Sequence, residues 1–394
     1  MLAICFALNM FSRGLGDTYA VFLLPLEREF GWSRSQTTGV YSVYLLVHGF
    51  TAPLVGMLFD RFGPRWVYGV GMASLGAAFF FASRLTGLWQ FYVLVGGVVG
   101  IGVSLNGMVP ASALLSRWFR ERLSTAIGIA YSSFGVGTLL LVPLAQHLIA
   151  ESGWRGAYRI LGGTLLAAAP LLALAVPWGR FTAGHPEHRR AKGKGGGEGW
   201  TVRAALRSPV YWGLTQVFFF TAAGMFAVLV QLVAFFIDAG FSPLAAASAY
   251  GAIGMMSAMS VMGSGFTSDR FGYRQVITAS FIGTATGMVL LLLIAISPLA
   301  VFLVLFVPAF GLCMGVRGPI VSSVTARYFA GPNVATIYGG IYAANAIGAA
   351  CGSFLGGLLH DFTGGYKVGF AFALVCVALA SAPFWSVREL RSFR

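Results

Sequence analysis

Three charged residues lie within long apolar runs, out of reach of water. Arg13 and Asp17 fall in the apolar run 2–24, four residues apart on one helical face, and Arg317 falls in the run 299–326. One charge at the middle of a membrane helix costs about 2.5–3.5 kcal/mol on insertion scales, so such residues indicate a function or a specific partner. Arg13 and Asp17 can pair with each other. No further acidic residue lies in the apolar runs to neutralise Arg317.

An unpaired guanidinium in an apolar environment favours a negatively charged ligand. The planar fork of Arg317 can donate two parallel hydrogen bonds to one carboxylate. Gly318 permits close backbone approach and Pro319 frees a carbonyl upstream, so we expect local distortion of the helix beside Arg317. These features predict a small organic anion, a mono- or dicarboxylate, as substrate. The alternatives are that Arg317 snorkels or binds backbone carbonyls as a packing device, and that Arg13 and Asp17 form a purely structural bridge.

Two residues could take up and release a proton during transport. Burial disfavours the charged form of Asp17 and Arg13 favours it, so an anion arriving at Arg13 would shift Asp17 toward protonation. His48, midway along the run 36–58, is the second candidate because imidazole titrates near neutrality. A single histidine in a membrane helix can also be a neutral hydrogen-bonding partner. The residues therefore favour a secondary transporter, and they leave proton-coupled symport and anion exchange open.

Uncharged polar residues in the apolar runs could bind the substrate or tie helices together. The substrate-binding candidates are Asn106, Tyr131, Gln216, Tyr342 and Asn345. Glycines four residues apart, as in Gly96/Gly100 and Gly352/Gly356, predict close helix contacts without a functional role.

The elements that must position these residues are membrane helices. The 394 residues are 57% hydrophobic and 10% charged, with a mean hydropathy of +0.80, which leaves too little polar surface for a water-soluble globule. One membrane span takes about 20 apolar residues. Long apolar runs fall at 2–24, 36–58, 66–83, 88–115, 123–149, 157–177, 210–237, 243–266, 275–296, 299–326, 333–359 and 367–386. The sequence therefore predicts an all-α membrane protein with twelve transmembrane helices.

The basic residues set the expected topology. The formal charge of +14 is spread between the apolar runs, which argues against nucleic-acid binding. Most of the 26 Lys and Arg residues fall in loops that are internal if both termini are cytoplasmic. The run 2–24 lacks a basic leader and a cleavage site, so we expect it to be a retained span. We expect a multi-pass monomer in a cell membrane, the bacterial inner membrane, with both termini cytoplasmic.

The two halves of the chain are repeats. A shift of 209 residues superposes one set of residues on another; the pairs include Glu29/Asp238, Tyr41/Tyr250, Gly56/Gly265, Asp60/Asp269, Arg61/Arg270, Phe62/Phe271, Gly63/Gly272, Arg65/Arg274 and Pro110/Pro319. The polar stretch 179–208 separates the halves and is rich in Gly, Lys and Arg, as a cytoplasmic linker would be. We expect six-helix bundles at 1–178 and 209–394, with a substrate site between them near mid-membrane.

At these residues the chain resembles the major facilitator superfamily. The stretch 56–65, GMLFDRFGPR, is similar to the superfamily signature between helices 2 and 3, and 265–274 is similar to its echo between helices 8 and 9. The stretch 25–34, PLEREFGWSR, resembles the monocarboxylate-transporter and oxalate/formate-antiporter branch, as do Arg117-Trp118-Phe119 and Gly153-Trp154-Arg155. The resemblance covers essentially the whole chain.

The resemblance implies both a gate and a cavity. In the superfamily the signature loops form a cytoplasmic charge lock. Here that lock would use Asp60, Arg61, Arg65, Asp269, Arg270 and Arg274. The alternative is that these loop charges only set the topology. Helices 1, 4, 7 and 10 line the cavity in relatives, which would place Arg13, Asp17 and Arg317 around one site. This chain lacks the helix 8 and helix 11 charges of the branch, so substrate identity does not transfer.

Other function classes have weaker support. His185 and His188 lie in the linker without a third ligand, so no metal is expected. We find no cofactor motif, no nucleophile with a base and no carboxylate dyad in the spans, and an enzyme is disfavoured. The alternative function is a facilitator that exports drugs or neutral amphipathic solutes, which the 34 phenylalanines would suit. A membrane receptor or enzyme that has borrowed the fold is a third possibility.

Overall fold

The protein forms two compact units of helices. The structure, a computed structural model, describes residues 1–119, 123–183, 200–329 and 334–391. The first compact unit consists of Met1–Lys192 with Leu232–Met255, and the second consists of Gly193–Gln231 with Met256–Arg394. No strand occurs in the described ranges. The prediction of an all-α membrane protein is confirmed.

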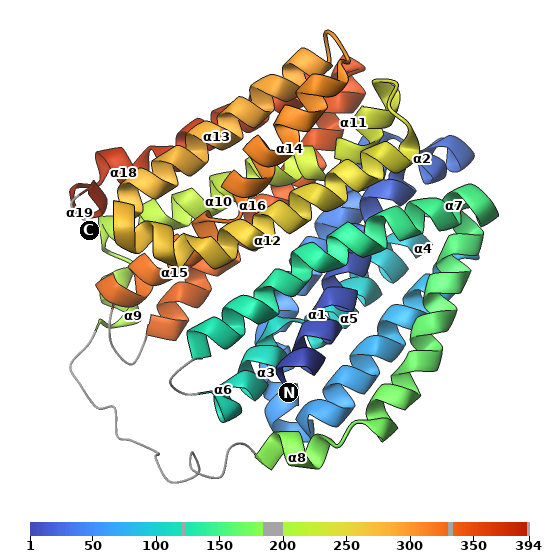
Figure 1. Cartoon of the computed structure of the whole chain (residues 1–394), viewed down its shortest axis with the longest axis horizontal. Helices are drawn as coiled ribbons and strands as arrows, with labels where there is room; N and C mark the ends of the chain where they lie inside the picture. The colour runs from blue at the N-terminus through green and yellow to red at the C-terminus, as the bar shows by residue number, and fades with distance from the viewer. Residues whose placement is uncertain (120–122, 184–199, 330–333, 392–394) are drawn as a thin grey trace. The chain divides into compact units, whose positions relative to one another are not determined.

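The helices follow the predicted apolar runs (Figure 1). Those of the first compact unit are α1(Leu2–Asp17), α2(Tyr19–Phe30), α3(Arg34–Ala82), α4(Leu88–Phe91), the π-helical η1(Tyr92–Val98), α5(Val99–Leu105), α6(Met108–Trp118), α7(Leu123–Ala175), α8(Trp178–Ala183) and α11(Leu232–Asp238). Those of the second are α9(Val202–Ala205), α10(Pro209–Leu229), α13(Tyr273–Ile294), α14(Ala300–Met314), α15(Arg317–Tyr328), α16(Val334–Thr363), α17(Lys367–Ser381), α18(Pro383–Ser386) and α19(Arg388–Arg391). Helix α12(Pro243–Phe271) passes from the first unit into the second after Met255.

Nine helices in the described ranges are long and apolar enough to cross a membrane. The candidate Ala126–Ala175 contains two of the predicted spans, 123–149 and 157–177. The predicted run 2–24 is divided between α1 and α2, and the run 66–83 is the second half of α3. Two predicted spans that are joined in one helix, one that is divided between two helices and one that is the second half of a longer helix account for the nine candidates in place of twelve.

Glycines in a left-handed backbone conformation turn the chain between successive spans. Gly63 within α3 has a φ of 75° and Gly153 within α7 has a φ of 68°. Gly272, the repeat partner of Gly63, has a φ of 83° between α12 and α13. Only glycine adopts this region without a steric penalty. The fold-back of α7 at its upper end is visible in Figure 1. The repeat pair Gly63/Gly272 therefore turns the chain at the same position in both halves.

Helices α1 and α7 of the first unit contact each other through backbone atoms at two glycines. A methyl group on Gly14 would lie 2.6 Å from the carbonyl carbon of Gly137, and one on Gly137 would overlap the Met10 carbonyl oxygen. Gly96 and Gly100 lie in the same way against Val43 and Val47 of α3, as the glycine spacing predicts. Without a hydrophobic force between helices in lipid, such close approach is a main source of association.

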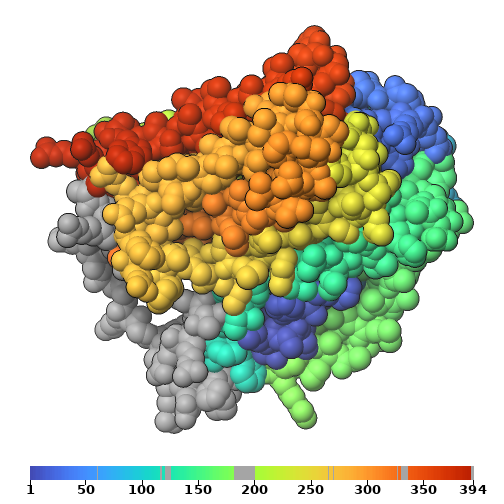
Figure 2. Space-filling view, turned by 45° about the horizontal axis from the view of Figure 1, so that its top comes forward, coloured from blue at the N-terminus to red at the C-terminus, as the bar shows by residue number. Residues whose placement is uncertain are grey.

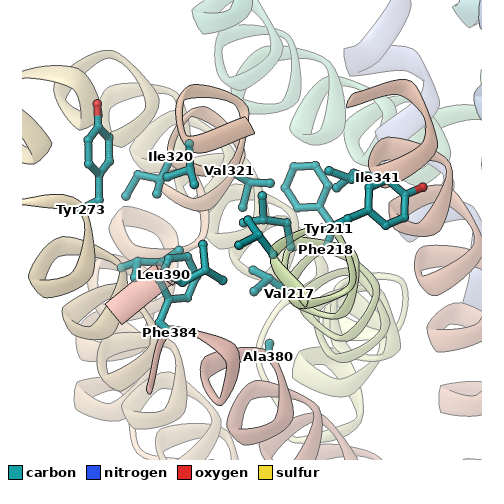
Figure 3. Packing of buried hydrophobic residues seen from close by; sticks show 14 of the residues in the cluster. Tyr211, Val217, Phe218, Tyr273, Ile320, Val321, Ile341, Ala380, Phe384 and Leu390 are labelled. Carbon is teal, nitrogen blue, oxygen red and sulfur yellow. The ribbon is translucent and has the colours of Figure 1, made fainter. Parts of the chain in front are cut away.

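The second unit repeats this packing between α10 and α16. Glycines at 348, 352 and 356 of α16 lie against the backbone at Phe219, Ala223 and Ala227 of α10. The predicted helix contact through Gly352 and Gly356 is confirmed. Figure 3 shows part of the apolar core beside this contact, in which side chains of α10 meet those of other helices of the second unit. The labelled members are Tyr211, Val217, Phe218, Tyr273, Ile320, Val321, Ile341, Ala380, Phe384 and Leu390.

Glu29, at the end of α2, is held by two side chains of α7. Arg155 forms an ion pair with Glu29, and the Trp154 indole Nε1 donates a hydrogen bond to the same carboxylate. The Arg155 guanidinium also lies 4.2 Å from the centre of the Trp154 ring. Hydrogen bonds from Arg155 and then from Trp154 lower the pKa of Glu29 from its ordinary value of 4.5.

We expect Glu29→Gln to lower stability slightly and only above the ordinary pKa of the carboxyl. Because the folded pKa is lowered, the stabilisation is fully present above pH 4.5 and is lost as the pH falls through the folded value. Both partners are about 40% exposed, so the effect should be about 1 kcal/mol or less. Thermal unfolding of wild type and variant between pH 3 and 7 would measure it. A stability difference that grows on acidification would contradict this assignment.

Candidate substrate and coupling site

Among the described residues, the helix is interrupted in five of the predicted spans, the first, fourth, seventh, tenth and twelfth. The break in the twelfth span falls at Ala382, and the others fall at Thr18, at Asn106–Gly107, at Val230–Gln231 and at Gly315–Val316. Asn106 and Gly315 are 209 residues apart, so the fourth and tenth spans break at the same repeat position. Backbone groups freed at such breaks are tolerated in a membrane only when they are buried in protein or line a cavity, and matched breaks in two repeats point to a transport site.

Buried amides with an unpartnered oxygen lie at two of these breaks. Asn106 is fully buried, and its Nδ2 donates to the Gly102 carbonyl at 2.9 Å. Gln231 is also buried, and its Nε2 donates to the Ala227 carbonyl at 3.2 Å. Among the described residues, none donates a hydrogen bond to Asn106 Oδ1 or to Gln231 Oε1. A buried acceptor without a donor is costly, so each oxygen is available to an added hydrogen-bond donor.

Arg13 and Asp17 form an ion pair just before the break in the first span. Arg13 Nε lies 3.4 Å from Asp17 Oδ1, and the two side chains are 22% and 11% exposed. The second carboxylate oxygen of Asp17 accepts a hydrogen bond of 2.7 Å from Thr138 Oγ1 of α7. The pairing predicted from the sequence is thus present. The hydrogen bond to α7 adds a partner from another helix.

Three buried tyrosines surround this ion pair. Tyr41 of α3 and Tyr250 of α12 both interact electrostatically with Arg13 and with Asp17. Tyr44 of α3 interacts with Arg13. The absence of a side chain at Gly16 leaves room for the Tyr44 hydroxyl, because a methyl group there would overlap it. Tyr41 and Tyr250 occupy the same position in the two repeats, so repeat-related tyrosines interact with one charged pair.

His48 belongs to the same group of side chains. Its ring stacks on that of Tyr44, with the centroids 6.1 Å apart and the planes 10° apart. It also lies within electrostatic range of Arg13, and its Nδ1 is buried without a hydrogen-bond partner. Tyr41, Tyr44 and His48 are spaced three and four residues apart on one face of α3. The first compact unit therefore brings together both residues predicted to carry protons.

Arg317 begins α15, directly after the break in the tenth span. It is 1% exposed, and its neighbours in the second unit are uncharged. Nε donates to Ser280 Oγ at 3.0 Å, and Nη2 donates to the Ser280 carbonyl at 3.0 Å and to Thr284 Oγ1. Nη1 contacts the Met225 sulfur at 3.7 Å, and the guanidinium lies 4.4 Å from the centre of the Phe281 ring.

The local distortion predicted beside Arg317 is present. Helix α14 ends at Met314 and α15 begins at Arg317, and Gly315 in between lies directly against Ser257 and Ser260 of α12. Among the residues that the structure describes, no carboxylate pairs with Arg317. The contacts of its guanidinium with hydroxyls and a backbone carbonyl also match part of the packing alternative. The charge itself is left uncompensated.

A cavity of about 450 Å³ lies next to the Arg317 contacts, among α12, α13 and α14. Helices α13 and α14 lie side by side on the face shown in Figure 2, in yellow-orange and orange. Ser280 lines the cavity, accepts from Arg317 and donates to the Cys313 carbonyl at 2.6 Å. One side chain therefore separates the cavity from the buried guanidinium. The remaining lining includes Ser260, Thr267, Gln275 and Cys313.

The sequence of nearly the whole chain matches one protein family. The family model described as Major Facilitator Superfamily matches residues 2–266 and 257–392. The chain belongs to the major facilitator superfamily. Members of this superfamily are membrane transporters, so the protein is a multi-pass transporter rather than an enzyme.

Curated relatives of this facilitator carry the name monocarboxylate transporter. Monocarboxylate transporter 13 of Bos taurus is 27% identical over 361 residues, which is 91% of this chain and 82% of that protein. Monocarboxylate transporter 4 of Gallus gallus is 37% identical over 175 residues, which is 44% of this chain and 36% of that protein. The higher identity is thus confined to a part of each chain.

A solved structure shares the fold of this facilitator. It is a bacterial homolog of the human lysosomal transporter Spinster, in an inward-facing and occupied conformation. The TM-score is 0.74 at 14% sequence identity, over 98% of this chain and 95% of that chain. The similarity supports the predicted facilitator fold of two six-helix halves.

The other predicted substrate ligands of this facilitator differ in their surroundings. Gln216 donates to the Leu379 carbonyl of α17 at 3.0 Å, and Asn345 donates to the Phe218 carbonyl of α10 at 3.4 Å. Both side chains therefore tie helices together, as the packing alternative expects. Tyr131 and Tyr342 are 41% and 45% exposed, and their rings contact aromatic neighbours. Of the five uncharged candidates, Asn106 is the one with a buried unpartnered acceptor.

The predicted cytoplasmic gate is described only for its arginines. Arg61 and Arg270 are exposed. The guanidinium carbon of Arg61 lies 5.3 Å from the centre of the Phe62 ring, and that of Arg270 lies 5.5 Å from the centre of the Phe271 ring. Arg274 lies 3.9 Å from the centre of the Trp385 ring, and Arg65 is exposed. The side chains of Asp60 and Asp269 are outside the described residues, and so is the linker pair His185/His188. The gate therefore stays a prediction.

Several residues at the site were not selected from the sequence. Tyr41 and Tyr250 carried a signal, because they superpose under the repeat shift, yet nothing in the sequence linked them to Arg13. Thr138 and Ser280 are ordinary hydroxyl residues in apolar runs, and only the packing of α7 on α1 and of α13 on α15 gives them their partners. Gln231, the second buried amide, could have been found from the sequence, because it is a polar residue inside the apolar run 210–237.

Proposed function

We propose that the protein is a secondary active transporter that moves a small organic anion, a mono- or dicarboxylate, across the membrane by alternating access. The observation that carries the proposal is the burial of Arg317 among neutral groups at the break of the tenth span. The names of the curated relatives, monocarboxylate transporters 13 and 4, support the same substrate class.

The energetics favour an anion as the missing partner of Arg317. A neutral hydrogen bond contributes about 1 kcal/mol net. Two opposite charges 4 Å apart attract by about 4 kcal/mol at an effective dielectric constant of 20. Nη1 of Arg317, whose protein contact is the Met225 sulfur, has N–H groups left to donate. A carboxylate that reaches this nitrogen gains more than the neutral contacts provide, so the site selects for negative charge.

Proton coupling is assigned to Asp17, with His48 as the second titratable group. In the resting site Asp17 balances the charge of Arg13. A substrate carboxylate that takes over Arg13 removes this stabilisation of the aspartate charge, so Asp17 gains a proton as the anion binds. One anion and one proton then move together, which is symport. Anion exchange without a proton is the outcome expected if Asp17 is only a structural partner.

We assign the other substrate contacts, the gate and the membrane topology as the sequence predicts them. Substrate contacts are assigned to Arg317, Arg13 and Asn106 first, and to Tyr131, Gln216, Tyr342 and Asn345 after them. The arginines at 61, 65, 270 and 274, with Asp60 and Asp269, are assigned to a cytoplasmic gate. We assign the protein to the bacterial inner membrane as a monomer, with both termini in the cytoplasm and bundles at 1–178 and 209–394 joined by the linker 179–208.

Transport by the purified protein in liposomes tests the proposed function. Vesicles loaded with an unlabelled mono- or dicarboxylate should take up the labelled acid by exchange. An inward proton gradient should then drive its accumulation in unloaded vesicles. Uptake of the acid by exchange but not by the proton gradient would support anion exchange and remove the role of Asp17. Uptake of amphipathic neutral solutes in place of any carboxylate would overturn the proposal.

A further inference from the structure

Two glycines of α12 bring this helix close to α7 beside the partner of Asp17: Gly251 lies against the Leu139 backbone and Gly254 lies against the Thr138 side chain. A methyl group on Gly251 would lie 2.9 Å from Leu139 Cα, and one on Gly254 would lie 2.8 Å from Thr138 Cβ. All of these residues belong to the first compact unit. Because Gly251 and Gly254 place no side chain of α12 in the contact, a bend of α7 at Thr138 acts directly on α12.

The hydroxyl of Thr138 has two acceptors and only one proton. Its Oγ1 lies 2.7 Å from Asp17 Oδ2 and 3.0 Å from the Phe134 carbonyl oxygen, one turn earlier in α7. An ionised Asp17 can only accept, so the hydroxyl proton is directed to the carboxylate. A protonated Asp17 has an O–H of its own and can donate it to Thr138 Oγ1. The threonine proton is then free to turn to the Phe134 carbonyl.

The second arrangement alters the helix itself. A threonine hydroxyl bonded to the carbonyl four residues earlier competes with the backbone hydrogen bond and bends an α-helix. Protonation of Asp17 therefore strengthens a bend in α7 at the residue that contacts Gly254. Proton uptake at Asp17 and the position of α12 are linked through a single hydroxyl group.

We propose that Thr138 is the positioning residue that transmits the protonation state of Asp17 to the contact between α7 and α12. This inference rests on the proposed coupling role of Asp17, and it adds the element that responds to the proton. Besides Thr138, the charged and titratable groups near Asp17 are Arg13 on its own helix, Tyr41 of α3 and Tyr250 of α12. Tyr44 and His48 of α3 act on Arg13. Among these groups Thr138 lies on α7 itself, in direct contact with Gly254.

Hydrogen exchange of the α7 backbone around 130–145 tests the link without relying on transport. At neutral pH, D17N, whose side chain is uncharged as a protonated aspartate is, should change the exchange of this segment severalfold relative to wild type. In a T138V background, which keeps the shape but has no hydroxyl, D17N should leave the exchange unchanged, and in a T138S background it should change the exchange as it does in wild type. An equal effect of D17N with and without the Thr138 hydroxyl, or no effect of D17N in wild type, would overturn the inference.

Transport by the same variants separates this inference from the proposed function. In liposomes T138V should reduce proton-driven carboxylate accumulation about tenfold, and T138S should restore it. G254A should reduce accumulation by a similar factor because its methyl group separates α7 from α12, whereas G128A, on an open face of α7, should not. If wild type carries no carboxylate while the exchange pattern is as expected, the substrate proposal fails and the Thr138 link stands. If wild type is proton-driven and T138V is equally so, the link fails alone.

Discussion

Replacing Arg317 by glutamine is expected to reduce carboxylate uptake into liposomes at least a hundredfold. Glutamine keeps a hydrogen-bond donor for Ser280 or Thr284 but removes the charge that attracts the anion. The loss of about 4 kcal/mol of charge–charge attraction corresponds to roughly a thousandfold in affinity, and partial compensation by other donors sets the lower figure. The measurement is the initial rate of labelled carboxylate exchange per folded molecule.

Two comparison variants separate charge from shape at this position. Arg317→Lys keeps the charge without the planar fork, so it should retain part of the uptake with a higher KM. Thr284→Val removes one neutral partner of the guanidinium and leaves the charge, so its uptake should fall severalfold at most. If the glutamine variant transports at the wild-type rate and only its thermal stability falls, Arg317 is a packing device and the carboxylate proposal loses its main support.

Replacing Gly352 by valine is expected to destabilise the second unit strongly. A side chain at this position would overlap the Ala223 carbonyl oxygen of α10, and backbone cannot move aside as a flexible side chain can. Overpacking of a tight contact costs about 1–3 kcal/mol, and the cost here should lie at or above the upper end of that range. The loss should appear as a lower midpoint of thermal unfolding and a smaller monodisperse fraction in detergent.

The control for this change lies on the same helix. Gly339 of α16 is exposed and has no heavy atom within 4 Å of the position a side chain would take. Gly339→Val therefore adds the same atoms to the same helix without a clash, and its unfolding midpoint should stay close to that of wild type. Equal midpoints for the two valine variants would mean that α10 and α16 are not in backbone contact.

Local sequence determined the elements and the residues that are close in the chain. Apolar runs long enough to cross a bilayer predicted the helices, and the 209-residue repeat paired Gly63 with Gly272, which both have a positive φ in the structure. The four-residue spacing of Arg13 and Asp17 predicted their ion pair, because helical geometry alone brings such residues together. Gly318 and Pro319 likewise predicted the distortion beside Arg317, since the backbone effect of these residue types is local.

Only the tertiary structure decided which partners meet these residues from other helices. The hydroxyl bonded to Asp17 comes from a position 121 residues away, and that bonded to Arg317 through Nε comes from 37 residues away. Residue type could not identify the hydroxyl partner of Asp17 or that of Arg317. Threonines and serines recur along the apolar runs, and most of them bond to a carbonyl of their own helix. Gln216 and Asn345 have side chains that could bind a substrate, but in the structure their amide groups donate to backbone carbonyls of neighbouring helices. The periodicity of a helix fixes which residues share a face, but the packing of small residues against backbone fixes what that face touches.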